Sequence, residues 1–146
     1  MRQDIIKRIK GYNHTALTVS DWDRSMKFYQ ALGFRFDNEW YHPSGNGWKM
    51  AMLTSDCAGQ IEFFDRGRDT LPDADARMHT PGCYYRLCYE VNSAGAIDEL
   101  YERALSAGGS ENMPPRPLEG SENGRAAAVY GPDSEVIMFL YGDRKS

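Results

Sequence analysis

The chain repeats itself once, and this duplication restricts its possible folds more than any other feature. Residues 14–19 (HTALTV) align with residues 86–91 (RLCYEV), and residues 60–64 (QIEFF) align with residues 136–140 (VIMFL). The period of this repeat is longer than that of a solenoid repeat. The sequence therefore predicts two copies of one supersecondary unit and not an array.

Each copy begins with a strand followed by a helix. Side chains alternate along residues 12–19, which places His14 on one face and Leu17 and Val19 on the face that a helix would cover. Ser20 and Asp21 are N-cap residue types that stand directly before an apolar repeat at helical spacing, made of Trp22, Met26, Tyr29 and Leu32. Gly33 then predicts the end of the helix.

The remaining segments complete two units of the pattern βαβββ. Further strands are predicted at residues 34–42, 48–54 and 60–65 in the first copy. The second copy is predicted to have a strand at 83–92 and a helix from Ala94 that ends at Gly108 and Gly109. A Pro- and Gly-rich loop at 110–124, with room for a short strand, precedes strands at 125–130 and 136–141. The expected modules are residues 9–66 and 83–142, joined by a linker at 67–82.

We therefore expect a single α+β domain of two βαβββ modules, whose curved sheets line a cleft for a small molecule. The faces turned away from the helices form this cleft. On this geometry, four equivalent inward positions carry His14, Glu62, Arg86 and Met138.

Composition restricts the class of partner. The 146 residues carry a formal net charge of -4 with interspersed signs, so no basic stripe suits nucleic acid. No apolar run approaches the roughly 18 residues of a membrane span, and the N-terminus lacks a signal-peptide pattern. The three cysteines are an odd number without a disulfide pattern. We expect a soluble cytoplasmic protein with free thiols.

Several segments together resemble the vicinal oxygen chelate superfamily, which includes glyoxalase I, bleomycin resistance proteins and extradiol dioxygenases. They are the first-strand histidine in NHTALTVSD, the helix end MKFYQALGF, the acidic QIEFF strand and the ending GPDSEVIMF, which resembles the family ending DPDGN-x-IE-L. The resemblance extends over residues 9–142. It implies the paired-module fold, a homodimer and a small-molecule ligand.

In metal-dependent members, the ligands come from the first, fourth, fifth and eighth strands. The resemblance places these positions at His14, Glu62, Arg86 and Met138. An arginine offers no lone pair, and a thioether is too soft for the divalent ions that the family uses. The expected cofactor is therefore none, or a divalent metal held weakly by His14 and Glu62, with Gln60 or His79 as further donors.

Arg86 suggests an alternative to a metal ion. Its guanidinium, facing Glu62, would clamp an anionic or carbonyl oxygen where the family places its cation, with His14 as a second donor. If chemistry occurs, Glu62 or His14 would remove a proton next to a carbonyl, as in a lyase or isomerase of the glyoxalase type. The competing interpretation is a buried structural ion pair of Glu62 and Arg86, with His14 as a core histidine. An extradiol dioxygenase is disfavoured, because such enzymes need two histidines and a carboxylate.

The other functional class is a binding protein, as in the bleomycin resistance proteins. The chain has three tryptophans, nine tyrosines and six phenylalanines, many of them on or beside predicted strands. Stacking on such rings suits planar ligands, although core or dimer packing would use the same residues. Cys88 reads either as a nucleophile beside a cation or as an apolar filler. The expected ligand-binding residues are Arg86, Tyr84, Cys88, Trp48, Met138 and Tyr130.

Overall fold

Module one contains a four-stranded sheet with one helix. The computed structural model describes residues 8–43, 47–65, 81–82 and 84–142, so most of the predicted linker, including His79, lies outside the described residues. The sheet has the order β1-β4-β3-β2, with β1 parallel to β4 and the other pairs antiparallel. Its elements are β1 (His14–Thr18), α2 (Trp22–Ala31), β2 (Arg35–Tyr41), β3 (Lys49–Thr54) and β4 (Gln60–Asp65).

Module two repeats this topology. Its sheet has the order β5-β8-β7-β6, again with the first and last strands parallel. The elements are β5 (Arg86–Glu90), α4 (Ala94–Ser106), β6 (Ser110–Pro117), β7 (Arg125–Tyr130) and β8 (Val136–Tyr141). The predicted α+β fold of two βαβββ modules is confirmed.

Residues 110–124 are expected as a loop that leaves room for a short strand, and β6 forms the first half of this segment. Two consecutive prolines, Pro114 and Pro115, hide the strand in the sequence. A proline is tolerated on an edge strand, where its missing N–H interrupts no ladder on the outer side. The register of β6 against β7 accordingly shifts twice, between Glu111 and Met113 and between Met113 and Arg116.

Both helices have the ends that the sequence predicts. The Asp21 carboxylate accepts a hydrogen bond from the backbone N–H of Arg24 (3.0 Å), and the hydroxyl of Ser93 accepts one from the N–H of Ala96 (3.2 Å). Such N-caps satisfy donors that have no partner within a helix. Beyond the helix ends, Gly33 and Gly108 have φ angles of 103° and 106°, which favour glycine. Among the described residues, neither helix has the length and apolar character needed to cross a membrane.

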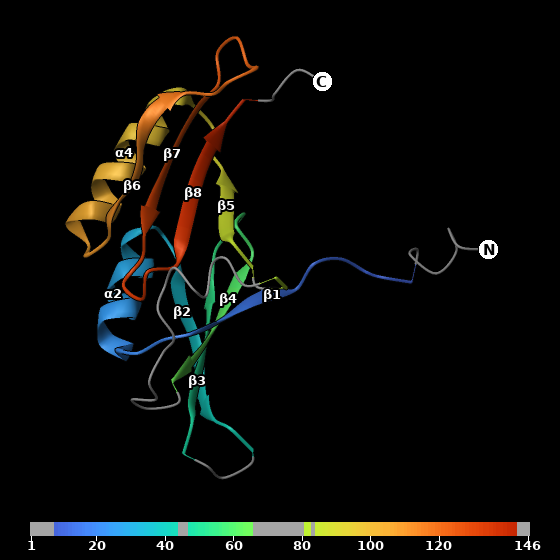
Figure 1. Ribbon diagram of the computed structural model, residues 1–146. Helices are drawn as coiled ribbons and strands as arrows, with labels where there is room; N and C mark the ends of the chain where they lie inside the picture. Colours follow the sequence, from blue (N-terminus) through green and yellow to red (C-terminus); the bar gives the residue numbers. More distant parts are fainter. Residues whose placement is uncertain (1–7, 44–46, 66–80, 83, 143–146) are drawn as a thin grey trace.

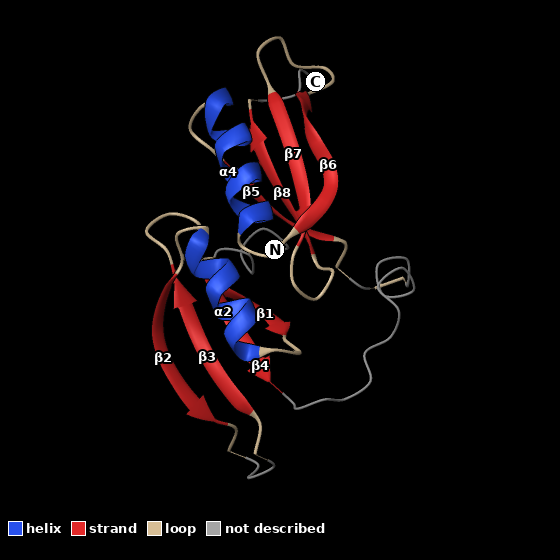
Figure 2. Ribbon diagram, turned by 90° about the vertical axis from the view of Figure 1, so that its left-hand side faces the viewer, coloured by secondary structure: helices blue, strands red, loops and turns tan. Residues whose placement is uncertain are grey.

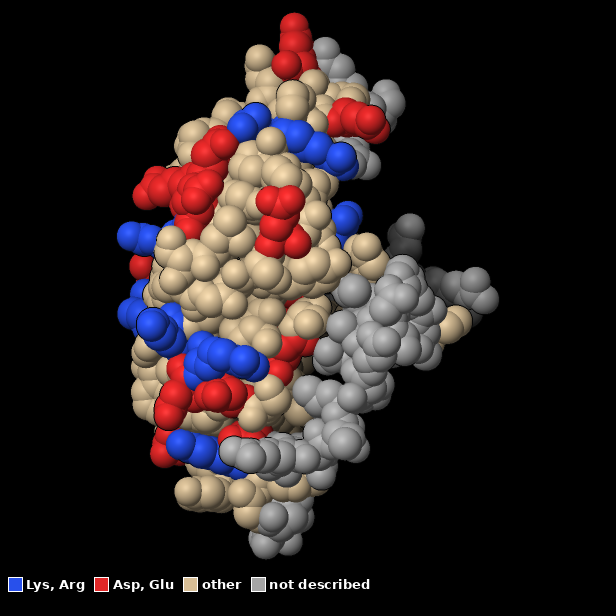
Figure 3. All heavy atoms as spheres, turned by 60° about the vertical axis from the view of Figure 1, so that its left-hand side comes forward, with Lys and Arg blue, Asp and Glu red and all other residues tan. Residues whose placement is uncertain are grey.

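The two helices lie on the same side of the two sheets (Figures 1 and 2), and one core extends beneath both. Val19, predicted to face a helix, is 2% exposed. The cluster joins side chains of both modules, including Phe28, Phe63, Ile97 and Phe139. Acidic and basic side chains are mixed on the helix-bearing face that Figure 3 shows. The modules are therefore parts of one hydrophobic unit.

A polar contact also joins the modules. The β7–β8 turn lies against the start of α2, where the Asp133 carboxylate accepts hydrogen bonds from the N–H (3.1 Å) and the hydroxyl of Ser20. The guanidinium of Arg24 donates to the Pro132 carbonyl (3.0 Å). Deeper in, the hydroxyl of Tyr29 donates to Oε1 of Glu135 (2.8 Å). These contacts fix module two against the helix of module one.

Candidate functional site

The strand registers give the duplicated positions the same geometry in each module. In module one, His14 is paired with Gln60 and Ala16 with Glu62 across β1 and β4. In module two, Arg86 is paired with Val136 and Cys88 with Met138 across β5 and β8. Because these offsets are identical, Arg86 occupies the position of His14, and Met138 that of Glu62.

The structure brings His14 and Glu62 together. Nε2 of His14 lies 3.8 Å from Oε1 of Glu62, and the two side chains are 34% and 14% exposed. The other ring nitrogen, Nδ1, lies 2.7 Å from the side-chain oxygen of Asn13. This contact orients the ring so that Nε2 faces the carboxylate. A histidine and a carboxylate are thus accessible side by side on adjacent strands.

Arg86 is not joined to this pair. Among the described residues, no ion pair links Arg86 to Glu62, and the guanidinium lies 5.8 Å from the centre of the Tyr85 ring. Arg86 is exposed at the start of β5. The interpretation as a buried structural ion pair therefore does not describe these two residues.

Met138 and Cys88 differ in their surroundings. Met138 is 5% exposed and packs in a second apolar cluster with Leu118, Ala128 and Val136. Cys88 is an exposed free cysteine. Partial burial of its sulfur raises the pKa of the Cys88 thiol, and nearby Arg86 offsets only part of that shift. The thiol is therefore protonated at neutral pH, which argues against its role as a nucleophile.

The predicted aromatic residues are spread over the molecule. Tyr84 is 98% exposed just before β5, and Tyr130 at the end of β7 packs against the second apolar cluster. Trp48 precedes β3, and its ring centre lies 5.4 Å from that of His42. Figure 1 places that hairpin end far from module two. These three rings do not form one binding surface.

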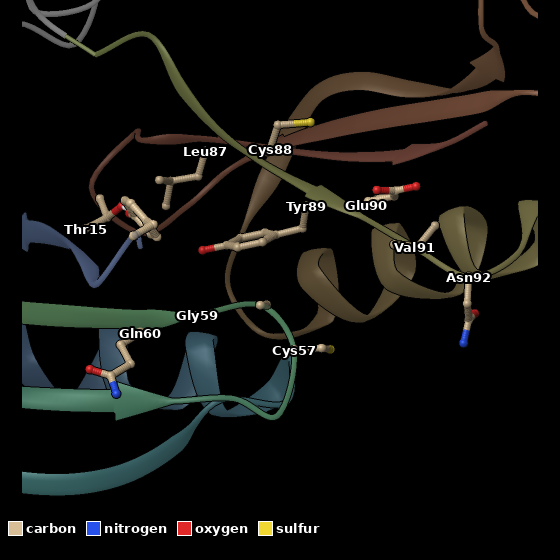
Figure 4. A pocket seen from close by; sticks show the side chains of 12 residues that line it. Thr15, Cys57, Gly59, Gln60, Leu87, Cys88, Tyr89, Glu90, Val91 and Asn92 are labelled. Carbon is tan, nitrogen blue, oxygen red and sulfur yellow. Dashed lines mark hydrogen bonds between the residues drawn. The ribbon is translucent and has the colours of Figure 1, made fainter. Parts of the chain in front are cut away.

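A cleft of about 780 Å³ lies between the two modules, and the sequence predictions missed most of its lining residues. Figure 4 shows β5 on one side and the β3–β4 turn with the start of β4 on the other. Of the predicted site residues, Cys88 and the possible further metal donor Gln60 line this cleft. The lining residues are Tyr12, Thr15, Cys57, Ala58, Gly59, Gln60, Leu87, Cys88, Tyr89, Glu90, Val91 and Asn92. The predicted topology carried one signal for this cleft, because the first strand of each βαβββ module lies at the edge of its sheet.

The ionisable groups of the cleft favour a neutral or cationic ligand. Burial, with a smaller contribution from Tyr12, raises the pKa of Tyr89 to about 12, so its phenol remains a hydrogen-bond donor. Within the described part of the chain, Glu90 is the one lining side chain with a formal charge at neutral pH, and no lysine or arginine lines the cleft.

The donor set of this chain does not fit a four-ligand divalent metal site. The positions equivalent to the superfamily ligands supply one imidazole and one carboxylate, while Arg86 and Met138 supply no suitable lone pair. Within the described residues, no group of three or more His, Cys, Asp and Glu side chains is placed to hold a metal ion.

Comparisons with known proteins agree with this architecture. Several solved structures share the fold. A glyoxalase/bleomycin resistance protein/dioxygenase domain from Frankia sp. EAN1pec is 21% identical, with a TM-score of 0.73 over 92% of this chain and 99% of that one. A fosfomycin resistance protein from Listeria monocytogenes is 20% identical, with a TM-score of 0.69 over 92% and 95%. A glyoxalase I variant from Zea mays is 24% identical, with a TM-score of 0.67 over 88% of this chain and 46% of that one.

The sequence comparison identifies the family. No curated protein matches the chain. The sequence model of one family matches residues 11–139, which is most of the chain. The chain therefore belongs to the Glyoxalase/Bleomycin resistance protein/Dioxygenase superfamily.

Proposed function

We propose that this protein binds a small aromatic or anionic organic molecule at the equivalent inward positions of its two sheets, which carry His14 and Glu62 in module one and Arg86 in module two, without a four-ligand metal site. The observation that carries the proposal is the identical register of the two modules. It sets Arg86 and Met138 at the positions where module one has His14 and Glu62. Module two thus has a cation and a buried apolar side chain where metal-dependent relatives have ligands.

Arg86 is suited to hold the ligand's negative group. A guanidinium presents planar, forked donors that match a carboxylate or phosphate, and it stays charged at every physiological pH. The side chain is exposed, with an aromatic ring, Tyr85, beside it. An aromatic acid could place its carboxylate on Arg86 and its ring against Tyr85 or the exposed edge of Cys88.

His14 and Glu62 in module one are the second set of polar groups available to a ligand, after Arg86 in module two. Their 3.8 Å separation leaves both able to accept or share a proton with a ligand. If the protein is catalytic, this pair is where a base would act on a bound carbonyl compound, in a lyase or isomerase reaction. The binding proposal does not require that step.

The experiment is a calorimetric titration with two probes of equal shape and opposite charge, 2-naphthoate and 2-naphthylmethylamine. We expect naphthoate to bind more tightly, and Arg86→Gln to weaken it by about tenfold, the loss of about 1.4 kcal/mol. Arg103→Gln removes the same charge from an exposed position in the last turn of α4 and should leave affinity unchanged. Equal naphthoate affinity in the wild type and Arg86→Gln, or no binding of naphthoate, would refute the proposal.

A further inference from the structure

Two strands that face the cleft between the modules have an unpaired edge. The sheet orders make β1 and β5 the terminal strands of their sheets. Among the described residues, neither strand has a ladder partner on its outer side. Such an edge presents a row of N–H and C=O groups that can pair with another extended segment.

Two backbone hydrogen bonds fix which groups of β5 face outward. The N–H of Val91 donates to the carbonyl of Leu140 (2.8 Å), as does the N–H of Val19 to Phe64 in the equivalent strand of module one (2.9 Å). Since backbone groups alternate along a strand, Tyr89 and Val91 turn toward β8. The N–H and C=O of Cys88 and Glu90 therefore point to the free edge.

This edge forms a wall of the cleft. Six consecutive residues, 87–92, line it from the β5 side, and residues 57–60 line it from the opposite side. In Figure 4 the ring of Tyr89 lies below β5 and is directed toward Thr15. A ligand in the cleft would lie along the edge of β5 with backbone donors and acceptors beside it.

The cleft continues past the end of β5. A second cleft of about 470 Å³ is lined by residues 121–124, Tyr141 and Gly142, and it shares Glu90, Val91 and Asn92 with the first. The two together form an elongated groove, which we call the edge groove. Among the residues that the structure describes, Glu90 and Glu122 line it, and no lysine or arginine does. Its shape and charge suit an extended, positively charged chain.

We propose that the edge groove binds a short, extended, basic peptide, which adds as a strand to the free edge of β5. This site lies at the strand edge, whereas the aromatic or anionic molecule proposed above would lie on the face. Main-chain hydrogen bonds to Cys88 and Glu90 would supply affinity, and the carboxylates would select basic side chains. The inference stands on the strand order, the backbone direction and the groove, and it does not depend on the proposed function.

The test uses acetyl-Lys-Val-Lys-Val-Lys-amide as the probe in calorimetry, with three comparison peptides. We expect a peptide with Glu in place of Lys to bind at least about tenfold more weakly. Two further peptides carry N-methyl groups on alternate sets of amides. N-methylation of the amides that face β5 should abolish binding. N-methylation of the alternate amides, which face away from β5, should not. Equal binding of the acidic and basic peptides, equal binding of both N-methylated peptides and the parent, or no binding at all would overturn the proposal.

Protein variants test the same contacts from the other side. Cys88→Pro removes the edge-facing N–H and should lower affinity for the basic peptide at least about tenfold, whereas Cys88→Ala keeps the N–H and should not. Glu90→Gln should weaken binding, and Glu99→Gln on the exposed side of α4 should not. In the wild type, the peptide should protect the amide hydrogens of Cys88 and Glu90 from exchange. This measurement decides the case even if Cys88→Pro fails to fold, and unchanged exchange at both amides would contradict strand addition.

Discussion

The environment of the Glu135 carboxyl group disfavours its ionised form. It lies in the turn between β7 and β8, where the N–H of Asp133 donates to Oε2 (2.8 Å) and Tyr29 donates to Oε1. A Cβ atom on residue 131 would overlap this carboxylate, so Gly131 makes room for it. Burial nevertheless raises the pKa of Glu135, because these hydrogen bonds only partly compensate for lost hydration.

The pKa of Glu135 leads to a prediction about pH. A raised pKa means that the folded state binds this proton more tightly than the unfolded state, so this group adds stability as the pH falls and removes it as the pH rises. Glu135→Gln should therefore be more stable than the wild type at pH 8, by up to about 1 kcal/mol, and this advantage should be smaller at pH 5. Urea unfolding at both values measures this difference. A variant that is less stable than the wild type at pH 8 would contradict it.

The residues of the candidate site show which side-chain positions and contacts the sequence predicts. The duplication correctly identified equivalent positions, and His14 does meet Glu62. The expected approach of Arg86 to Glu62 is not seen, because these residues lie on different sheets and the angle between modules is not encoded in strand alternation. Tyr12 and Tyr89 were missed for the same reason, since their cleft depends on how two edges meet.

Helices and strands follow local signals, and most were predictable. Alternation and capping located β1, α2, β4, α4, β7 and β8 to within a few residues. The exception, β6, carries three prolines that conflict with ordinary strand propensity. Its pairing with β7 is a tertiary interaction that overrides this local signal.

At the level of an element, the cap of α2 has a measurable energy. Asp21→Ala removes the acceptor for the N–H of Arg24 and should lower the free energy of unfolding by about 1 kcal/mol. Asp23→Ala is the matched control, because Asp23 is an exposed acidic residue of the first turn that caps no N–H group. It should lose only a few tenths of a kcal/mol, roughly, from the helix dipole. Thermal unfolding of both variants checks the difference, and equal losses would show that charge and not capping matters.

For the whole molecule, the two modules can share one metal ion only if their equivalent positions come together, and two substitutions test whether they do. Arg86→His combined with Met138→Glu would give each module a histidine and a carboxylate at matching positions. The buried Met138 site makes an unpaired Glu unfavourable, so the double variant should be less stable than the wild type without metal. Nickel should then raise its melting temperature and bind at least about tenfold more tightly than to the wild type.

The control for this metal experiment is His14→Ala in the double variant, which should abolish the gain. Calorimetry with Ni²⁺ and Zn²⁺ provides the measurement. A different result would favour the alternative function. If the wild type takes up one stoichiometric metal ion, and Glu62→Ala abolishes that uptake, a metal-dependent lyase or isomerase of the glyoxalase type replaces the binding proposal.

Because one core joins both modules, we expect that the chain cannot be divided into two halves that fold independently. Phe63 of module one and Ile97 and Phe139 of module two belong to the same buried cluster. A half-chain made alone would expose its share of that cluster to water and should be poorly folded. Mixed together, the two halves should behave as complementing fragments, each supplying the surface that the other needs in order to fold.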